Sequence, residues 1–190
     1  MKKQIRLLGI DDAPFHFYNH TVPLIGVVMR GGEYLECVLK QEITIDGNDV
    51  TPTVIAMILQ TKHRQQLKAV LLDGITFGGF NILDIHQVYQ TTNLPIITIT
   101  RDKPNFQKIK KALQTHFSDW KKRYELLKKQ TIFEVPTKHN PMFVSYLGLT
   151  FDEAKEIIKL STIRGVIPEP IRVAHIIASG ITRGESYGKS

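Results

Sequence analysis

The chain has 190 residues, of which 42% are hydrophobic and 23% are charged, a composition typical of one globular domain rather than a disordered or fibrous protein. Its single cysteine, Cys37, excludes an internal disulfide, and no apolar run approaches the roughly 20 residues that cross a bilayer. A net charge of +7 is compatible with a polyanionic partner such as nucleic acid. We therefore expect a soluble, cytoplasmic protein with one domain over residues 1–190.

The first part of the chain predicts three antiparallel strands. Residues 5–10 and 22–29 are short apolar runs, and Gly31-Gly32 is typical of a hairpin turn into residues 33–45. That third stretch alternates between an apolar face and a polar face that includes Glu36. The apolar face consists of Cys37, Leu39, Ile43 and Ile45.

After residue 50 the pattern changes to helices that alternate with buried strands. Thr51-Pro52 is typical of a helix start, Asn81 of an N-cap, and Thr150 with Glu153 of a capping box. Further strands are expected at residues 69–72, 95–99, 132–135 and 142–147, and helices at 81–90, 106–117, 118–129 and 171–182. This order predicts a mixed α/β sheet with helices on both faces.

Acidic residues follow two of the predicted strands. Asp11 and Asp12 end the first strand, and Asp73 ends the buried strand at residues 69–72. Sites in open α/β sheets form at the carboxyl ends of strands, and carboxylates that converge there can bind Mg²⁺. Asp11 and Asp73 are therefore candidate metal ligands, although aspartate also begins turns, which for Asp12 is an equally good interpretation.

A third carboxylate precedes the first helix. Asp46 can belong to a tight turn with Gly47, whereas Asp49 lies nearer the helix start, so we prefer Asp49 as the third ligand. Gly78 and Gly79 follow Asp73 and would let the backbone approach a phosphate closely. A strand-to-helix turn needs such residues in any case.

The last predicted helix has Arg172 and His175 on one face. Histidine titrates near neutrality and arginine binds phosphate through two donors, so we expect a catalytic role for His175 and phosphate binding by Arg172. The alternative is that His175 is packed in the core and that Arg172 caps the helix. Many lysines lie between residues 103 and 129, and we expect Lys121 and Lys122 to bind a nucleic-acid backbone. The alternative is that these lysines only form the solvent-exposed faces of two helices.

Two motifs carry a family resemblance. Leu8-Gly9-Ile10-Asp11-Asp12-Ala13 resembles the Gly-Val-Asp motif on the first strand of endonuclease V, and Val70-Leu71-Leu72-Asp73-Gly74 resembles the Val-Asp-Gly strand end of that family. The whole chain more closely resembles an uncharacterised family related to endonuclease V. The segments that carry this likeness are Gly9-Ile10-Asp11-Asp12, Leu72-Asp73-Gly74-Ile75-Thr76, Gly79-Phe80-Asn81 and Pro168-Glu169-Pro170-Ile171-Arg172-Val173-Ala174-His175.

The resemblance implies a ribonuclease-H-like fold, in which a three-strand antiparallel meander joins parallel strands in one sheet. It also implies that Asp11 and Asp73 bind Mg²⁺ or Mn²⁺ and that the protein hydrolyses phosphodiesters of DNA or RNA. The leading hypothesis is a metal-dependent nuclease or related phosphoesterase. The alternatives are a non-catalytic nucleic-acid-binding relative and a hydrolase of a small phosphorylated metabolite.

Two departures from endonuclease V bear on specificity. Residues 40–45 contain no Pro-Tyr-hydrophobic-Pro wedge, and Thr51-Pro52 stands where endonuclease V has a glutamate at the helix start. Extruding an altered base from a helix requires a wedge and a shaped pocket. We therefore expect a nuclease that is not specific for inosine.

Overall fold

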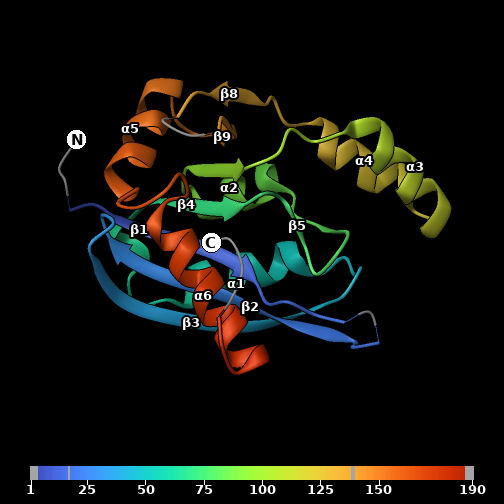
Figure 1. Ribbon diagram of the computed structural model, residues 1–190, viewed down its shortest axis with the longest axis horizontal. Coiled ribbons are helices and arrows are strands. Elements are labelled where there is room, and N and C mark those ends of the chain that lie inside the picture. The colour runs from blue at the N-terminus through green and yellow to red at the C-terminus, as the bar shows by residue number, and fades with distance from the viewer. Residues whose placement is uncertain (1–3, 17, 138–139, 187–190) are drawn as a thin grey trace.

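A computed structural model describes residues 4–16, 18–137 and 140–186 of the chain (Figure 1). The strands are β1 (Arg6–Asp12), β2 (Thr21–Arg30), β3 (Tyr34–Thr44), β4 (Leu67–Asp73), β5 (Thr76–Phe77), β6 (Asn81–Ile82), β7 (Ile96–Thr100), β8 (Phe133–Val135) and β9 (Met142–Leu147). The helices are α1 (Val50–Gln60), the short 3-10 helix η1 (Arg64–Gln66), α2 (Ile85–Thr92), α3 (Phe106–His116), α4 (Trp120–Lys128), α5 (Phe151–Ser161) and α6 (Glu169–Arg183).

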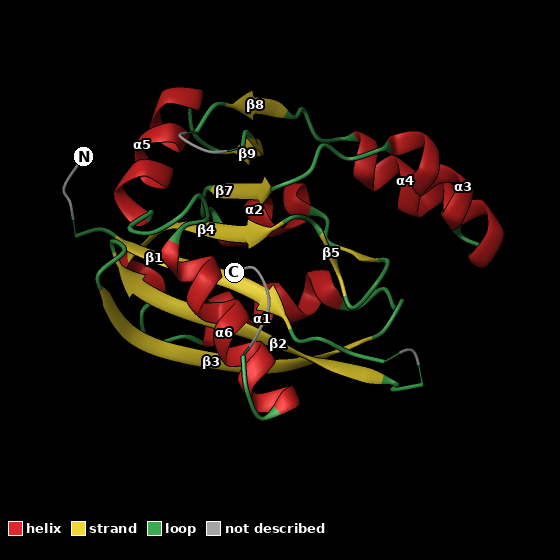
Figure 2. Ribbon diagram, viewed as in Figure 1, coloured by secondary structure: helices red, strands yellow, loops and turns green. Residues whose placement is uncertain are grey.

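Seven of these strands form one mixed sheet in the order β3-β2-β1-β4-β7-β9-β8. β1, β2 and β3 form an antiparallel meander, β1, β4 and β7 are parallel, and β9 and β8 return antiparallel. The predicted ribonuclease-H-like sheet is therefore confirmed. Because β1, β4 and β7 run the same way, their carboxyl ends share one edge, and α3 and α4 lie beyond that edge (Figure 2).

Helices cover both faces of the sheet, as the sequence predicts. α6 crosses one face over β1 and β2, whereas α1 packs against β3 and α2 on the other (Figure 1). Side chains alternate along β1: Leu8 and Ile10 pack in one cluster with Val54 of α1, and Leu7 packs in another with Ile171 of α6. This alternation decides which face each residue at the end of β1 can reach.

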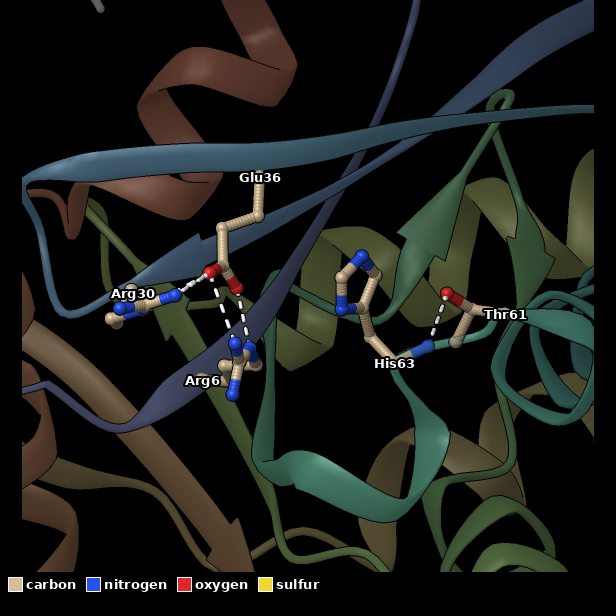
Figure 3. Close-up of polar contacts among 5 residues, drawn as sticks. All are labelled: Arg6, Arg30, Glu36, Thr61 and His63. Atoms are coloured by element: carbon tan, nitrogen blue, oxygen red, sulfur yellow. Dashed lines mark hydrogen bonds and ion pairs between the residues drawn. The ribbon is translucent and has the colours of Figure 1, made fainter.

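Three charged side chains lie together near the start of β1 (Figure 3). Glu36 of β3 accepts hydrogen bonds from the guanidinium groups of Arg6 and Arg30. The simple alternation predicted for β3 fails at Glu36, because the β2–β3 register is irregular after Val28. The Glu36 side chain is consequently only 13% exposed. Figure 3 also shows the His63 amide donating to Thr61 Oγ1, 3.3 Å away, just after α1.

One helix start differs from the prediction. Residues 81–82 form β6, and α2 begins only at Ile85, where the Asp84 carboxylate accepts from two helix amides. Asn81 is thus not the N-cap. The capping box of Thr150 and Glu153 at the start of α5 is confirmed. Within the described residues, no helix is long and apolar enough to span a membrane.

Candidate functional site

Asp11 and Asp73 stand at the ends of neighbouring parallel strands. The register pairs Gly9 with Leu71 and Ile10 with Leu72, so the next two residues along are Asp11 and Asp73. Both aspartates continue the face that α6 covers, because Gly9, two residues before Asp11, contacts α6 directly. Asp11 is only 5% exposed, so water screens its charge poorly.

The electrostatics reflect this crowding of carboxylates. Burial and the neighbouring Asp11 carboxylate raise the pKa of Asp73 to about 6, against the opposing effects of Arg101 and His175. Burial, and then Asp11, also raise the pKa of Asp12 to about 7. Like charges in a poorly solvated place favour a bound proton or a bound cation. The site can therefore take up positive charge.

His175 of α6 contacts this carboxylate pair. Its Nδ1 lies 2.8 Å from Asp11 Oδ2, and this hydrogen bond raises the pKa of His175 above its ordinary value. The close docking of α6 depends on Gly9, since a Cβ built there would lie 2.2 Å from the carbonyl carbon of Pro170. The fold thus brings a histidine from the end of the chain onto an aspartate near its start.

Two further charged groups belong to this edge. Asp12 points to the opposite face of β1, where its Oδ2 accepts from the Gly78 amide at 2.9 Å. Arg101 follows β7, and its charge partly opposes the rise in the pKa of both Asp73 and His175. Arg101 was not among the predicted site residues. Strand alternation from Ile99, which pairs with Asp73, could have identified it.

The structure does not bring Asp49 to the pair formed by Asp11 and Asp73. Its carboxylate accepts from the amide and hydroxyl of Thr44 and from Asn81 Nδ2. Burial would raise the pKa of Asp49, but the hydrogen bonds from Thr44 and Asn81 hold it below its ordinary value. The alternative third ligand, Asp46, accepts from the Phe80 amide at 2.7 Å. Both carboxylates hold loops together.

The predicted phosphate-binding residues have protein partners as well. Gly78 and Gly79 adopt positive φ angles of 49° and 86°, and a Cβ at Gly79 would lie 2.3 Å from Asp46 Oδ1. Arg172 donates from two nitrogens to Glu169, and this hydrogen bonding raises the pKa of the guanidinium. These three residues thus have local structural roles in this conformation.

Lys121 and Lys122 are exposed on α4, at the edge where the parallel strands end (Figure 1). α4 is fixed there by Arg123, which is only 4% exposed and donates to the carbonyl oxygens of Gly47 and Phe80. This role could not be predicted, because Arg123 lies within a run of basic residues in the sequence. Arg123 thus anchors α4 to the loops that contain Gly47 and Phe80.

A divalent cation fits the paired carboxylates, although the ligand set is small. Within residues 4–16, 18–137 and 140–186, no three His, Cys, Asp or Glu side chains converge as a ligand cluster. Mg²⁺ commonly uses one or two protein carboxylates and retains several waters. Asp11 and Asp73 meet that requirement, and the raised pKa of Asp73 is the property that a bound cation would relieve.

The chain is similar to known proteins in sequence and in structure. Residues 3–182 match the family described as endonuclease dU. A UPF0215 protein from Methanosarcina mazei is 46% identical over 193 residues, which cover 100% of this chain and 97% of the relative. A protein of unknown function from Archaeoglobus fulgidus has a crystal structure that matches with a TM-score of 0.84 at 36% identity, covering 94% of this chain and 98% of that one.

A more distant structure shares the fold. Ciona intestinalis endonuclease V, in complex with a 24mer DNA containing an inosine followed by a ribo-adenosine, matches with a TM-score of 0.60 at 16% identity. The match covers 90% of this chain and 83% of that one. This likeness supports the endonuclease V type of ribonuclease-H-like architecture. On its sequence, the chain belongs to the endonuclease dU family.

Proposed function

We propose that this protein is a divalent-cation-dependent endonuclease that hydrolyses phosphodiester bonds of nucleic acid, with Asp11 and Asp73 as the cation ligands. The observation that carries the proposal is the position of these two carboxylates at the ends of parallel strands, with a pKa of about 6 for Asp73. Membership of a family described as an endonuclease supports the same reaction class.

When bound, Mg²⁺ or Mn²⁺ would activate a water and stabilise the departing oxygen. The protein itself contributes the orientation of Asp11, which His175 Nδ1 holds at 2.8 Å. His175 also places an exchangeable proton beside the reacting groups, and its raised pKa favours the protonated ring near neutral pH. Hydrolysis adds water across one P–O bond, so a proton source near the departing oxygen assists the step.

The substrate class follows from the surface around the carboxylates. α4 presents Lys121 and Lys122 at the same edge, which suits a polyanion. The family description makes a strand containing deoxyuridine the first substrate to test, and we expect no preference for inosine because the wedge is missing.

A small phosphorylated metabolite is a weaker candidate. The cavity beside Gly74 has a volume of about 100 Å³, well below the roughly 300–1,000 Å³ of common ligand pockets. Thr98 and Thr100 line it, and these alternate with Ile97 and Ile99, which share the face of Asp73. The cavity therefore opens on the other face of the sheet.

The test compares oligonucleotides of one sequence that contain one deoxyuridine, one inosine or neither, as single strands and as duplexes, with Mg²⁺, Mn²⁺ or EDTA. We expect cation-dependent cutting without inosine preference, and a loss on the order of 100-fold or more in Asp73→Asn. Asp152→Asn is the matched control, because Asp152 is 89% exposed on α5 and pairs only with Lys155 at 2.7 Å.

Two outcomes would overturn the proposal. Cutting that persists in EDTA, or that Asp73→Asn and Asp152→Asn reduce equally, would remove the cation site from the reaction. Binding of all strands without any cutting would instead favour a non-catalytic nucleic-acid-binding relative. Strong preferential cutting beside inosine would leave the nuclease in place but contradict its expected specificity.

A further inference from the structure

α3 and α4 form a strongly basic helical hairpin at the carboxyl edge of the parallel strands (Figure 2). Residues 106–129 contain seven lysines and one arginine against two acidic residues, so this segment carries a net charge of +6 in a chain whose total is +7. Lys128 and Lys129 pair with carboxylates of Glu125 and Asp84. Within the described part of the chain, Lys110, Lys121 and Lys122 have no such acidic partner.

Aromatic rings are interleaved with these lysines. Lys110 Nζ lies 6.0 Å from the ring centroid of Trp120 and 5.6 Å from that of Tyr124. Lys121 reaches the Trp120 ring at 5.8 Å, and Lys128 reaches the Tyr124 ring at 5.4 Å. Both rings are only partly buried, with one part against the core. Each ring is therefore packed in part against the core and lies beside lysine ammonium groups of the same hairpin.

The hairpin is fixed relative to the acidic edge. Arg123 of α4 donates to the Phe80 carbonyl, and the same short segment includes Gly78, whose amide binds Asp12 beside Asp11. The Asn48 amide also reaches the Asp119 carboxylate just before α4, at 3.3 Å. The hairpin is thus fixed at the carboxyl edge of the parallel strands, on the side of the sheet to which Asp12 points.

We propose that the α3–α4 hairpin is a platform for single-stranded nucleic acid, on which unpaired bases stack against Trp120 and Tyr124 while Lys110, Lys121 and Lys122 contact phosphates. Proteins that bind single strands combine a basic surface with aromatic rings in this way. A duplex hides its base faces and can use only the lysines. The proposal rests on the nucleic-acid nuclease proposed above, and it adds the strand form that the protein takes and the residues that select it.

Trp120 is the only tryptophan in the chain, so intrinsic fluorescence reports on one half of the platform. Full-length protein is titrated with a 16-nucleotide oligothymidylate and with a duplex of equal length, in EDTA to prevent cutting. We expect the single strand to quench Trp120 fluorescence and the duplex to bind more weakly without quenching. Tyr124→Leu should reduce single-strand affinity about 10-fold, since stacking on each ring contributes substantially.

Further variants separate stacking from charge. Trp120→Phe should keep affinity in an anisotropy assay with labelled oligonucleotide, whereas Trp120→Leu should reduce it about 10-fold. Replacing Lys121 and Lys122 together by glutamine should lower the slope of log affinity against log salt by about 0.7 for each lost phosphate contact. Phe151→Leu is the matched control, because Lys155 lies 4.7 Å from the Phe151 ring on α5 and this pair should not affect binding.

The outcomes also separate the two proposals. Asp73→Asn should bind oligothymidylate as wild type does. Wild-type protein that binds oligothymidylate but cuts no strand with Mg²⁺ or Mn²⁺ would remove the nuclease and leave the platform. Cutting that survives while Trp120 fluorescence is unchanged by any strand, or equal effects of Tyr124→Leu and Phe151→Leu, would remove the platform and leave the nuclease. Binding of the duplex equal to that of the single strand would also overturn it.

Discussion

The carboxylates that lie near the two ends of β1 have pKa values shifted in opposite directions. Near the start of the strand, Glu36 lies between Arg6 and Arg30, whose hydrogen bonds lower its pKa (Figure 3). At the other end, Asp11 neighbours Asp73, and burial together with Asp11 raises the pKa of Asp73 to about 6. At the first end, one carboxylate has two arginine partners. At the other end, two carboxylates lie beside one arginine, Arg101, and one histidine, His175.

This difference separates a structural charge from a functional candidate. A carboxylate that accepts hydrogen bonds from two arginines links neighbouring strands, and few of its lone pairs remain free to bind a ligand. Buried carboxylates that lie side by side, with a pKa that stays raised as at Asp73, are costly to the free protein when charged and gain most when a cation binds. Asp49 and Asp46, held by hydrogen bonds within loops, resemble Glu36 in this respect. The criterion therefore selects the Asp11–Asp73 pair.

The largest expected contrast between the two ends is in catalysis. Asp11→Asn should reduce strand cutting on the order of 100-fold or more, because it removes the charge of a proposed cation ligand and the negative charge beside His175. Glu36→Gln should leave cutting within about twofold, since Glu36 accepts its hydrogen bonds from Arg6 and Arg30 at the far end of the strand. Initial rates under saturating Mg²⁺ measure both. Equal losses of cutting rate in Asp11→Asn and Glu36→Gln would show that the two ends of β1 do not differ in their importance for catalysis.

Much of the fold, and the placement of Asp11 and Asp73 at one edge of the sheet, could be predicted because they depend on local patterns. Strand alternation and helix periodicity reflect burial directly, so β9 and the capping box at Thr150 were placed correctly. Asp11 and Asp73 followed from a topological rule, since parallel strands end at one edge. No partner residue had to be known for either inference.

Other features depend on contacts between distant segments. Asp49 lies at the predicted helix start, but its partner Asn81 comes from 32 residues later, and only the packed loops bring them together. The register irregularity that redirects Glu36 has no signature in the alternation of β3. Likewise Lys110 and Trp120 meet only once α3 and α4 pack, so the sequence shows lysines without a visible aromatic motif.

The second contrast concerns the stability of the cation-free protein. A pKa raised from 3.8 to about 6 means that the folded state binds a proton more tightly than the unfolded chain, so stability falls as pH rises through that window. Asp73→Asn removes this penalty and should stabilise the protein at pH 8 in EDTA by up to about 3 kcal/mol. The gain should vanish near pH 4.

Urea denaturation at pH 8 and pH 4 tests this, with Asp152→Asn as the variant expected to change neither value. Adding Mn²⁺ at ten times its dissociation constant should stabilise wild type by about 1.4 kcal/mol and should not stabilise Asp73→Asn. An Asp73→Asn protein that is less stable than wild type at pH 8 would show that Asp73 is already satisfied by the protein, as Glu36 is.

The smallest contrast is the stability contribution of Glu36, which should have the opposite sign. Its hydrogen bonds from Arg6, and then those from Arg30, lower its pKa below 4.5, so the contribution is present above that value and is lost as pH falls through the lower folded pKa. Glu36→Gln should cost about 1 kcal/mol at pH 7, because Arg30 is partly exposed and water screens part of the attraction. The deficit should shrink in acid and in 1 M salt. If Glu36→Gln were as stable as wild type at pH 7, pairing with arginine would not stabilise this end of β1, and the two ends would differ only in what they can bind.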